Sequence, residues 1–136
     1  MASFNFQGAD ELLKEFERMG ADLSERGPAM AMAGGRAAVA EMEKRVPVRT
    51  GGLKGHIAIK GPFHTTMDGY YVDVFPDGTK KNGRKRERYA AIGYILEYGR
   101  SNMAARPWMR PAVEEGADAS NEAMANARTD SLEGCA

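Results

Sequence analysis

The scarcity of large apolar side chains constrains the fold of this chain more than any other feature of its sequence. Leu, Ile, Val and Phe together supply 21 of the 136 residues, and Ala alone supplies another 21. A share of large apolar residues below about 20% is typical of disorder only when the net charge is also high. Here 19 basic and 19 acidic residues cancel. We therefore expect one folded domain with a thin core, to which neighbouring chains add stability.

The absence of certain sequence segments excludes several classes of protein. No run of about 18 apolar residues is present, so no membrane span is expected. The first residues lack the charged and apolar regions of a signal peptide. The single cysteine, Cys135, has no partner for a disulfide within the chain, and no Cys/His set has the spacing of a structural zinc site. These observations predict a protein made in a reducing cytoplasm, without a cofactor, a bound metal or a membrane partner.

Charge is balanced overall but unevenly distributed along the chain. The formal net charge is −3 over residues 1–44, +8 over residues 45–110 and −5 over residues 111–136. A basic middle between acidic ends has three interpretations. The basic part contacts a polyanion such as DNA, or it contacts the acidic part of another copy, or all three surfaces are solvated and have no partner.

Hydrophobic spacing predicts two helical segments near the N-terminus. Residues 8–24 carry one apolar stripe at helical period, formed by Leu12, Phe16, Met19 and Leu23. Gly27 and Pro28 follow, and Pro28 is well placed as the first residue of a second helix over residues 28–45. The prediction is therefore one long helix or a kinked helix pair.

Small residues and prolines shape the remaining helical segments. Gly34 and Gly35 each cost a helix about 1 kcal/mol relative to Ala, and we expect them to let another backbone approach closely. A last helix is predicted from about residues 108–111 to about Arg128. A loose tail over residues 129–136 is expected to follow it.

The middle of the chain has the patterns of strands and turns. Residues 53–60 alternate in polarity and residues 70–75 are rich in aromatic and β-branched residues, so both segments predict strands. The polar residues 78–86 predict a mobile loop. Residues 87–98 fit a helical stripe that ends at a Gly99 cap, with a strand as the alternative. The predicted fold is α+β: a small antiparallel β-sheet with a short helix and the C-terminal helix packed on it, in a single domain over residues 1–128.

A search for catalytic residues finds no complete set. His56 is predicted within the first strand and His64 in the loop after it, and neither has a Cys or Asp at motif spacing. The sequence contains no zinc-protease, P-loop or nucleophile-elbow motif. An enzyme needs at least a base or nucleophile with an orienting partner, so we expect a protein that is not an enzyme. A small hydrolase that uses one of these histidines with a nearby Asp is an alternative.

The strongest binding signal is a basic segment over residues 80–88. It has six cations and one acid, Glu87. The cations are Lys80, Lys81, Arg84, Lys85, Arg86 and Arg88. Such a segment neutralises phosphates without reading bases, so non-specific nucleic-acid binding is one interpretation. Contact with the acidic helices of another copy and a merely solvated loop are the other two.

Two short segments, residues 47–53 and 97–99, carry residues with clear local roles. The first contains Pro47, Thr50, Gly51 and Leu53. Its proline ends a helix, and the turn through the threonine and glycines leads the chain into a strand. The second segment, Glu97-Tyr98-Gly99, combines a carboxylate with a helix-ending glycine.

A third segment, residues 105–112, leads into the last helix. It contains Arg106, Pro107, Trp108, Arg110 and Pro111. The arginines are able to pair with a carboxylate such as Glu97 in forked geometry. The tryptophan, the single one in the chain, is suited to fill a core or to anchor an interface.

In this order and spacing, the three segments resemble the tail-component family of siphophages and prophages. Its members are also described as head–tail joining or tail completion proteins, and their pattern is P-x-x-T-G-x-L, then E-[FY]-G, then A-R-P-[FW]-hydrophobic-R-P-A. The resemblance covers about residues 8–125. Arg49 stands where the family commonly has Asp, and Arg100 stands where it often has Thr, so both differences add positive charge.

The resemblance implies a structural subunit of the neck, where a DNA-filled head meets a tail. Such a subunit is expected to form a ring around the DNA channel through heterologous contacts. The implied partners are copies of itself, other neck and tail proteins, and DNA in the channel through non-specific contact. The implied location is the virion, after synthesis in the host cytoplasm. Tail completion, adaptor and terminator roles are not separated by the sequence.

Overall fold

One long helix organises the molecule. The computed structural model describes residues 9–65 and 69–133, and α1 spans Ala9–Arg45, 37 residues, with Pro28 in its interior. The break expected at Gly27-Pro28 is absent, and the alternative of one long helix is confirmed. Proline has no N–H for the carbonyl four residues earlier, which belongs to Ser24. That carbonyl oxygen instead accepts the Tyr70 hydroxyl at 3.2 Å, so a neighbouring strand replaces the bond that proline removes.

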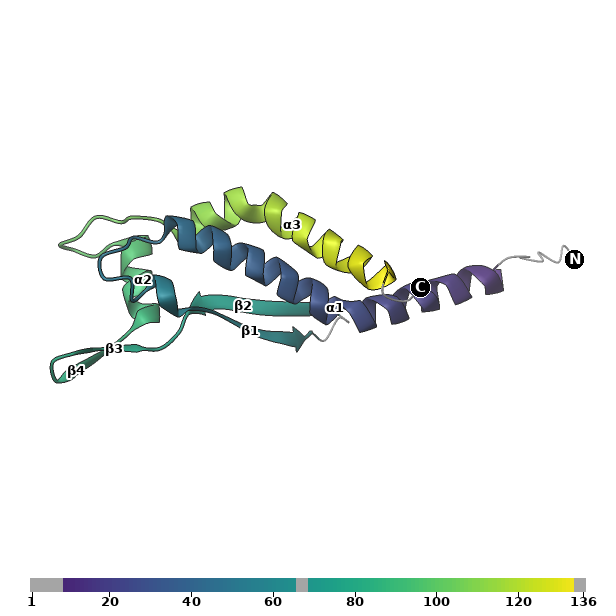
Figure 1. Cartoon of the computed structure of the whole chain (residues 1–136), viewed down its shortest axis with the longest axis horizontal. Helices are drawn as coiled ribbons and strands as arrows, with labels where there is room; N and C mark the ends of the chain where they lie inside the picture. The colour runs from purple at the N-terminus through teal and green to yellow at the C-terminus, as the bar shows by residue number, and fades with distance from the viewer. Residues whose placement is uncertain (1–8, 66–68, 134–136) are drawn as a thin grey trace, which may run out of the picture.

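Helix α1 is covered along its C-terminal half by two different layers (Figure 1). On one side runs α3, Met109–Glu133, antiparallel to α1. On the other lies an antiparallel pair of strands, β1 (Ile57–His64) and β2 (Tyr70–Pro76). Their register shifts between Lys60 and Phe63, at a Gly-Pro pair, because proline cannot donate to the strand ladder.

Two adjacent glycines let both layers approach α1. A Cβ added at Gly34 would lie 2.9 Å from Cγ of Met124 in α3, and one added at Gly35 would lie 2.8 Å from Cγ2 of Val72 in β2. Both distances are shorter than side-chain contacts allow. The glycines therefore admit close neighbours on two sides of the same helical turn, but these neighbours are side chains and not the backbone that the sequence predicts.

The segment after α1 departs from the predicted strand over residues 53–60. A 3₁₀ turn, η1, occupies Lys54–His56, and β1 begins only at Ile57. Local bonds favour the turn: the Gly55 N–H donates to the Gly51 carbonyl at 3.0 Å, and the His56 N–H donates to that of Leu53 at 3.2 Å. The strand predicted over 70–75 is confirmed as β2.

Residues 78–98 form a second hairpin and a short helix. The hairpin consists of β3, Thr79–Asn82, and β4, Lys85–Arg88, so the mobile loop expected over residues 78–86 is wrong. Gly83, at φ 62°, supplies the positive φ that a two-residue hairpin turn needs. Helix α2 spans Tyr89–Tyr98, which confirms the helical interpretation of this segment over the strand.

The core is small and lies at one end of the molecule. Within the described residues, the buried hydrophobic cluster consists of Met42, Val46, Leu53, Tyr89, Trp108 and Ala112. They come from the end of α1, the turn after it, the start of α2 and the start of α3. Helix α3 continues to Glu133, so residues 129–133, which the sequence assigns to a tail, are helical. Residues 134–136 of that expected tail lie outside the described residues.

Candidate functional site

The three sequence motifs meet at the core end, where α1 stops and α3 starts. Trp108 lies at the centre, with 0% of its side chain exposed, and its indole Nε1 donates to the Gly93 carbonyl oxygen at 3.2 Å. Leu53 of the first motif is buried in the same cluster. The tryptophan therefore fills the core, which is the first of the two roles that the sequence allows it.

Glu97 binds the start of α3. Its Oε2 accepts the backbone N–H groups of Trp108 and Met109 at 2.7 and 2.8 Å, and its Oε1 accepts that of Arg110 at 3.1 Å. The first N–H groups of a helix lack partners within the helix and carry partial positive charge. Among the described residues, no ion pair joins Glu97 to the Arg106 or Arg110 guanidinium group, so the predicted forked pairing is not formed and backbone donors bind this carboxylate instead.

The environment of Glu97 favours the ionised carboxylate. Burial acts to raise the pKa of this group, which is 8% exposed. The three backbone N–H donors and the charge of Arg110 act in the opposite direction and prevail, so the pKa lies below its usual value. Glu97 is thus a charged cap that one helix supplies to the next.

Backbone bonds tie the second motif to the third. Gly99 ends α2 at φ 74°, and its N–H donates to the Ile95 carbonyl at 2.7 Å, as expected for a helix cap. A Cβ at Gly99 would lie 2.7 Å from the backbone nitrogen of Ala105, so the loop closes too tightly for any other residue. The Arg106 N–H donates to the Leu96 carbonyl at 2.7 Å.

The first motif forms the turn that leads out of α1. Pro47 follows directly after the buried Val46, and Gly51 adopts φ 75°. Thr50 is exposed, as are Arg49 and Arg100, the two arginines that differ from the family pattern. The positive charges of these two arginines are therefore available at the surface of the core end.

The basic hairpin, β3–β4, sorts its charges onto two faces. Cross-strand partners share a face, and the register pairs Thr79 with Arg88 and Lys81 with Arg86. Because side chains alternate along a strand, these two pairs lie on one face, which has three cations and no carboxylate. The opposite face pairs Lys80 with Glu87 and Asn82 with Lys85, while Gly83 and Arg84 form the turn.

The cations of the basic hairpin are open to solvent. Every residue of the two strands is exposed except Lys80, which is half-buried. Across residues 9–65 and 69–133, no ion pair involves a hairpin residue. At the base of the hairpin lies a hollow of about 230 Å³, lined by Phe75, Pro76, Asp77, Gly78, Thr79, Arg88 and Ala90. Figure 1 shows the hairpin projecting from the core end.

At the opposite end, α1 continues beyond both of its covering layers (Figure 1). We call residues 9–22 the arm. Its large apolar side chains are 56–61% exposed: Leu12, Leu13, Phe16 and Met19. The stripe that the sequence predicts is thus helical but uncovered. The side chain of Leu23, its fourth predicted member, lies outside the described residues.

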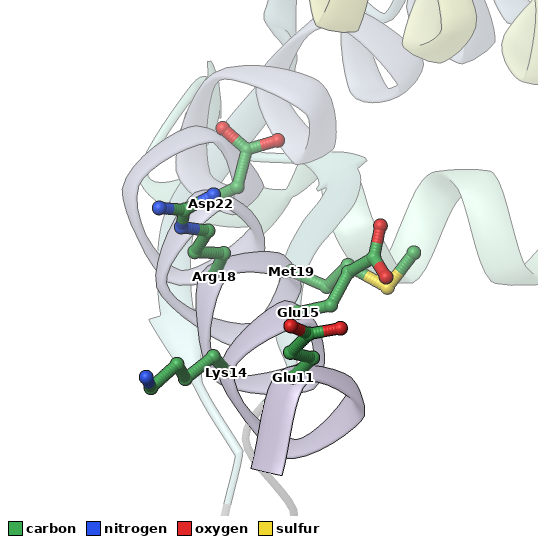
Figure 2. A pocket seen from close by; sticks show the side chains of 6 residues that line it. All are labelled: Glu11, Lys14, Glu15, Arg18, Met19 and Asp22. Atoms are coloured by element: carbon green, nitrogen blue, oxygen red, sulfur yellow. The ribbon is translucent and has the colours of Figure 1, made fainter. Parts of the chain in front are cut away.

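An open hollow of about 620 Å³ follows the arm (Figure 2). The described residues that line it are Glu11, Lys14, Glu15, Arg18, Met19 and Asp22. All of them belong to α1, and residues on one exposed helix do not enclose a small molecule as a ligand pocket does. The described lining residues therefore do not form an enclosed ligand pocket.

The histidines lie elsewhere than the sequence predicts. His56 is in η1, not in a strand, and its Nδ1 lies 2.7 Å from the Gly52 carbonyl while its ring stacks on Tyr89 at 4.1 Å. His64 is the last residue of β1, edge-on to Tyr70. Hydrogen bonding by the Gly78 N–H and then pairing with Lys60 lower the pKa of Asp77, whose carboxylate faces these groups. The charge of His56 also lowers the pKa of Asp77, to a smaller extent.

Within residues 9–65 and 69–133, no group of three or more His, Cys, Asp or Glu side chains is placed to hold a metal ion. No helix there combines the length and the apolar character needed to span a membrane.

Sequence reasoning missed two features of this structure. The capping role of Glu97 has a signal in hindsight, because Glu97 is the one charged residue in the otherwise uncharged segment Tyr89–Tyr98. The uncovered arm has none, because a stripe at helical spacing does not tell whether another element covers it.

Comparison with known families gives the class of protein, a bacteriophage tail component. The family model described as "Bacteriophage HK97-gp10, putative tail-component" matches residues 10–99, which include α1, both hairpins and α2. The chain belongs to this HK97 gp10-like family. Comparisons with curated proteins and with solved structures give no match.

Proposed function

We propose that the chain is a structural subunit of the head–tail connection, a neck or tail completion component, and not an enzyme. It acts by assembling with copies of itself into a ring and by docking other neck and tail proteins. The observation that supports this most is the placement of opposite charges on different parts of an elongated chain. The basic hairpin carries a net charge of +5 over residues 80–88, and residues 111–136 carry −5. Heterologous contacts between unlike surfaces close into rings when the rotation between copies permits it.

The thin core supports the same proposal. A small buried hydrophobic cluster at one end leaves much of α1 and α2 with apolar side chains in water, which costs solubility in a free monomer and is relieved on assembly. The sequence supports a non-enzymatic function, because neither histidine has a Cys or Asp at motif spacing.

The decisive test removes the chain from the phage. Particles made without it are examined by electron microscopy and by infectivity, with the wild-type chain supplied in trans as the control. We expect filled heads and separate tails, and recovery of joined particles on complementation. Joined, infective particles in the absence of the chain would contradict the proposal. In particles that contain it, the position and symmetry of the chain in a reconstruction identify the neck layer and the ring size.

Non-specific DNA binding by the basic hairpin is a second candidate function. The face with Lys81, Arg86 and Arg88 and no carboxylate favours it. Fluorescence anisotropy with a labelled random-sequence duplex measures the affinity across a salt series. Three phosphate contacts predict a slope of about −2.7 in log affinity against log salt, and the triple change of these residues to Ala should flatten it. The matched control is Lys14→Ala with Arg18→Ala in the arm. No binding at low salt rejects this function.

A further inference from the structure

We propose that the arm of one copy docks onto the exposed face of α2 in the next copy, beside the basic hairpin. The proposal rests on the proposed assembly of copies and specifies which surfaces meet. The contact is heterologous, because the arm and α2 lie at opposite ends of the same molecule (Figure 1).

The arm is an uncovered apolar stripe with acidic edges. On a helical wheel, Leu12, Phe16 and Met19 fall within one narrow sector, and their side chains are 56–61% exposed. Glu11, Glu15 and Asp22 border this sector on one side, and Asp10 and Glu17 lie beyond Leu13 on the other. Lys14 and Arg18 lie further round the helix from the stripe than Glu11, Glu15 and Asp22, and they line the same hollow as these three acids. A partner for this stripe needs an apolar centre and cationic margins.

The stripe continues the side of α1 that α3 covers further along. Gly34 meets Met124 of α3, and Gly34 falls in the same helical sector as Leu12 and Phe16. The Arg26 guanidinium reaches the Arg128 carbonyl near the end of α3, at 3.3 Å. Beyond this point the arm runs for about 20 Å at 1.5 Å per residue. The same side of one helix is therefore covered by α3 in one half and by nothing from the described residues in the other.

Helix α2 offers the matching surface. Its buried side holds Tyr89, Gly93 and Glu97, which leaves an exposed face with no charge. Tyr94 and Tyr98 dominate that face, with 64% and 61% exposed and ring centroids 4.7 Å apart. The basic hairpin leads directly into α2, and Arg100 is exposed just after it. An uncharged aromatic face between cations is the complement of an apolar stripe between carboxylates.

Charge favours a contact between the arm and α2 over a contact between two arms. Residues 9–22 carry five acids and two bases, so two arms side by side place like charges against each other. Contact with the basic hairpin, at +5, opposes unlike charges instead. A repeated contact between unlike ends also yields a ring or an open series, which a symmetric arm–arm contact does not.

The test uses two variants of the full chain that each remove one side of the contact. Phe16→Asp disables the arm, and Tyr94→Asp disables the α2 face; both side chains are more than half exposed, so the fold is retained, as circular dichroism will verify. Val113→Asp, at a position 57% exposed on α3, is the matched control. Analytical ultracentrifugation over a concentration series measures the oligomers.

We expect wild type and Val113→Asp to form extended or closed oligomers and each disabling variant alone to stay monomeric, with affinity reduced about tenfold or more. An equimolar mixture of the two variants should form a dimer, because it retains one intact arm and one intact α2 face. Loss of assembly in Phe16→Asp but not in Tyr94→Asp overturns the proposal, as does a wild-type chain that stays monomeric throughout. A phage that requires this monomeric chain for joining would leave the proposed role at the head–tail connection intact while rejecting the contact between copies.

Discussion

The carboxylate of Glu97 tests most directly how this fold is held together. In Glu97→Gln, the amide oxygen replaces Oε2 and keeps the Trp108 and Met109 donors, but the NH₂ group then faces the Arg110 N–H. A buried donor without an acceptor costs about 1–3 kcal/mol, and loss of the charge at the helix start costs about 0.3–2 kcal/mol more. We expect a total near 2–3 kcal/mol. Glu97→Ala strands all three donors and should cost about 4 kcal/mol.

Thermal unfolding followed by circular dichroism measures this loss, at one protein concentration for all variants. For a domain of this size, about 4 °C of melting temperature corresponds to 1 kcal/mol, so Glu97→Gln should melt about 8–12 °C below wild type. Glu114→Gln, which removes an exposed carboxylate from α3, is the control and should change the melting temperature little. An unchanged melting temperature in Glu97→Gln at neutral pH refutes the capping argument.

The same variant predicts a pH dependence. Backbone donors outweigh burial and place the pKa of folded Glu97 below its usual value, so the unfolded chain binds more protons between the two pKa values. The stabilisation is complete above the unfolded pKa of about 4.3 and is lost as the pH falls through the folded pKa. The difference in free energy of unfolding between wild type and Glu97→Gln should therefore decrease on acidification. A difference that stays constant down to the acid limit contradicts the assignment of charge to this cap.

Two further perturbations follow from the packing. Trp108→Ala should cost about 3–5 kcal/mol in urea unfolding, because the side chain is 0% exposed; a loss below 1 kcal/mol would show that the core does not depend on it. Gly35→Ala should destabilise the chain despite the higher helix propensity of Ala, because the new Cβ meets Val72 at 2.8 Å. Gly20→Ala, with nothing within 4 Å, is the control and should be neutral or stabilising by up to about 1 kcal/mol. Equal effects at the two glycines reject the close-approach argument.

The sequence predicted those elements whose signal is local. Local patterns predicted the helix α2 from its apolar period and the strand β2 from its aromatic run, and both are present. The small residues of α1 likewise lie where neighbouring elements pack closely. The basic hairpin was not predicted because its residues are polar, which is typical of a loop. Its two strands pair because one glycine, Gly83, adopts a positive φ in the turn. The sequence left both one long helix and a kinked helix pair open at Pro28, because the hydrogen bond that supports the continuous helix comes from the Tyr70 hydroxyl, 46 residues away along the chain from Ser24.

The candidate site was predictable in its residues more than in its contacts. The motif residues around Trp108 do converge, yet the role of Glu97 depends on where the next helix begins in space. The arm is exposed because α3 ends beside the middle of α1 and does not reach it. Neither relation is encoded within the short windows from which periodicity and propensity are judged.

The cap that Glu97 supplies shows that the family match and the folded unit end at different residues. The family match ends at Gly99, two residues after this carboxylate, whereas the donors that it binds lie at residues 108–110. A fragment cut where the match ends would keep the acceptor, discard all three donors and strip the α3 layer from Gly34. The segment that the family model matches is therefore shorter than the part of the chain that folds together, and a shortened version for study has to retain α3.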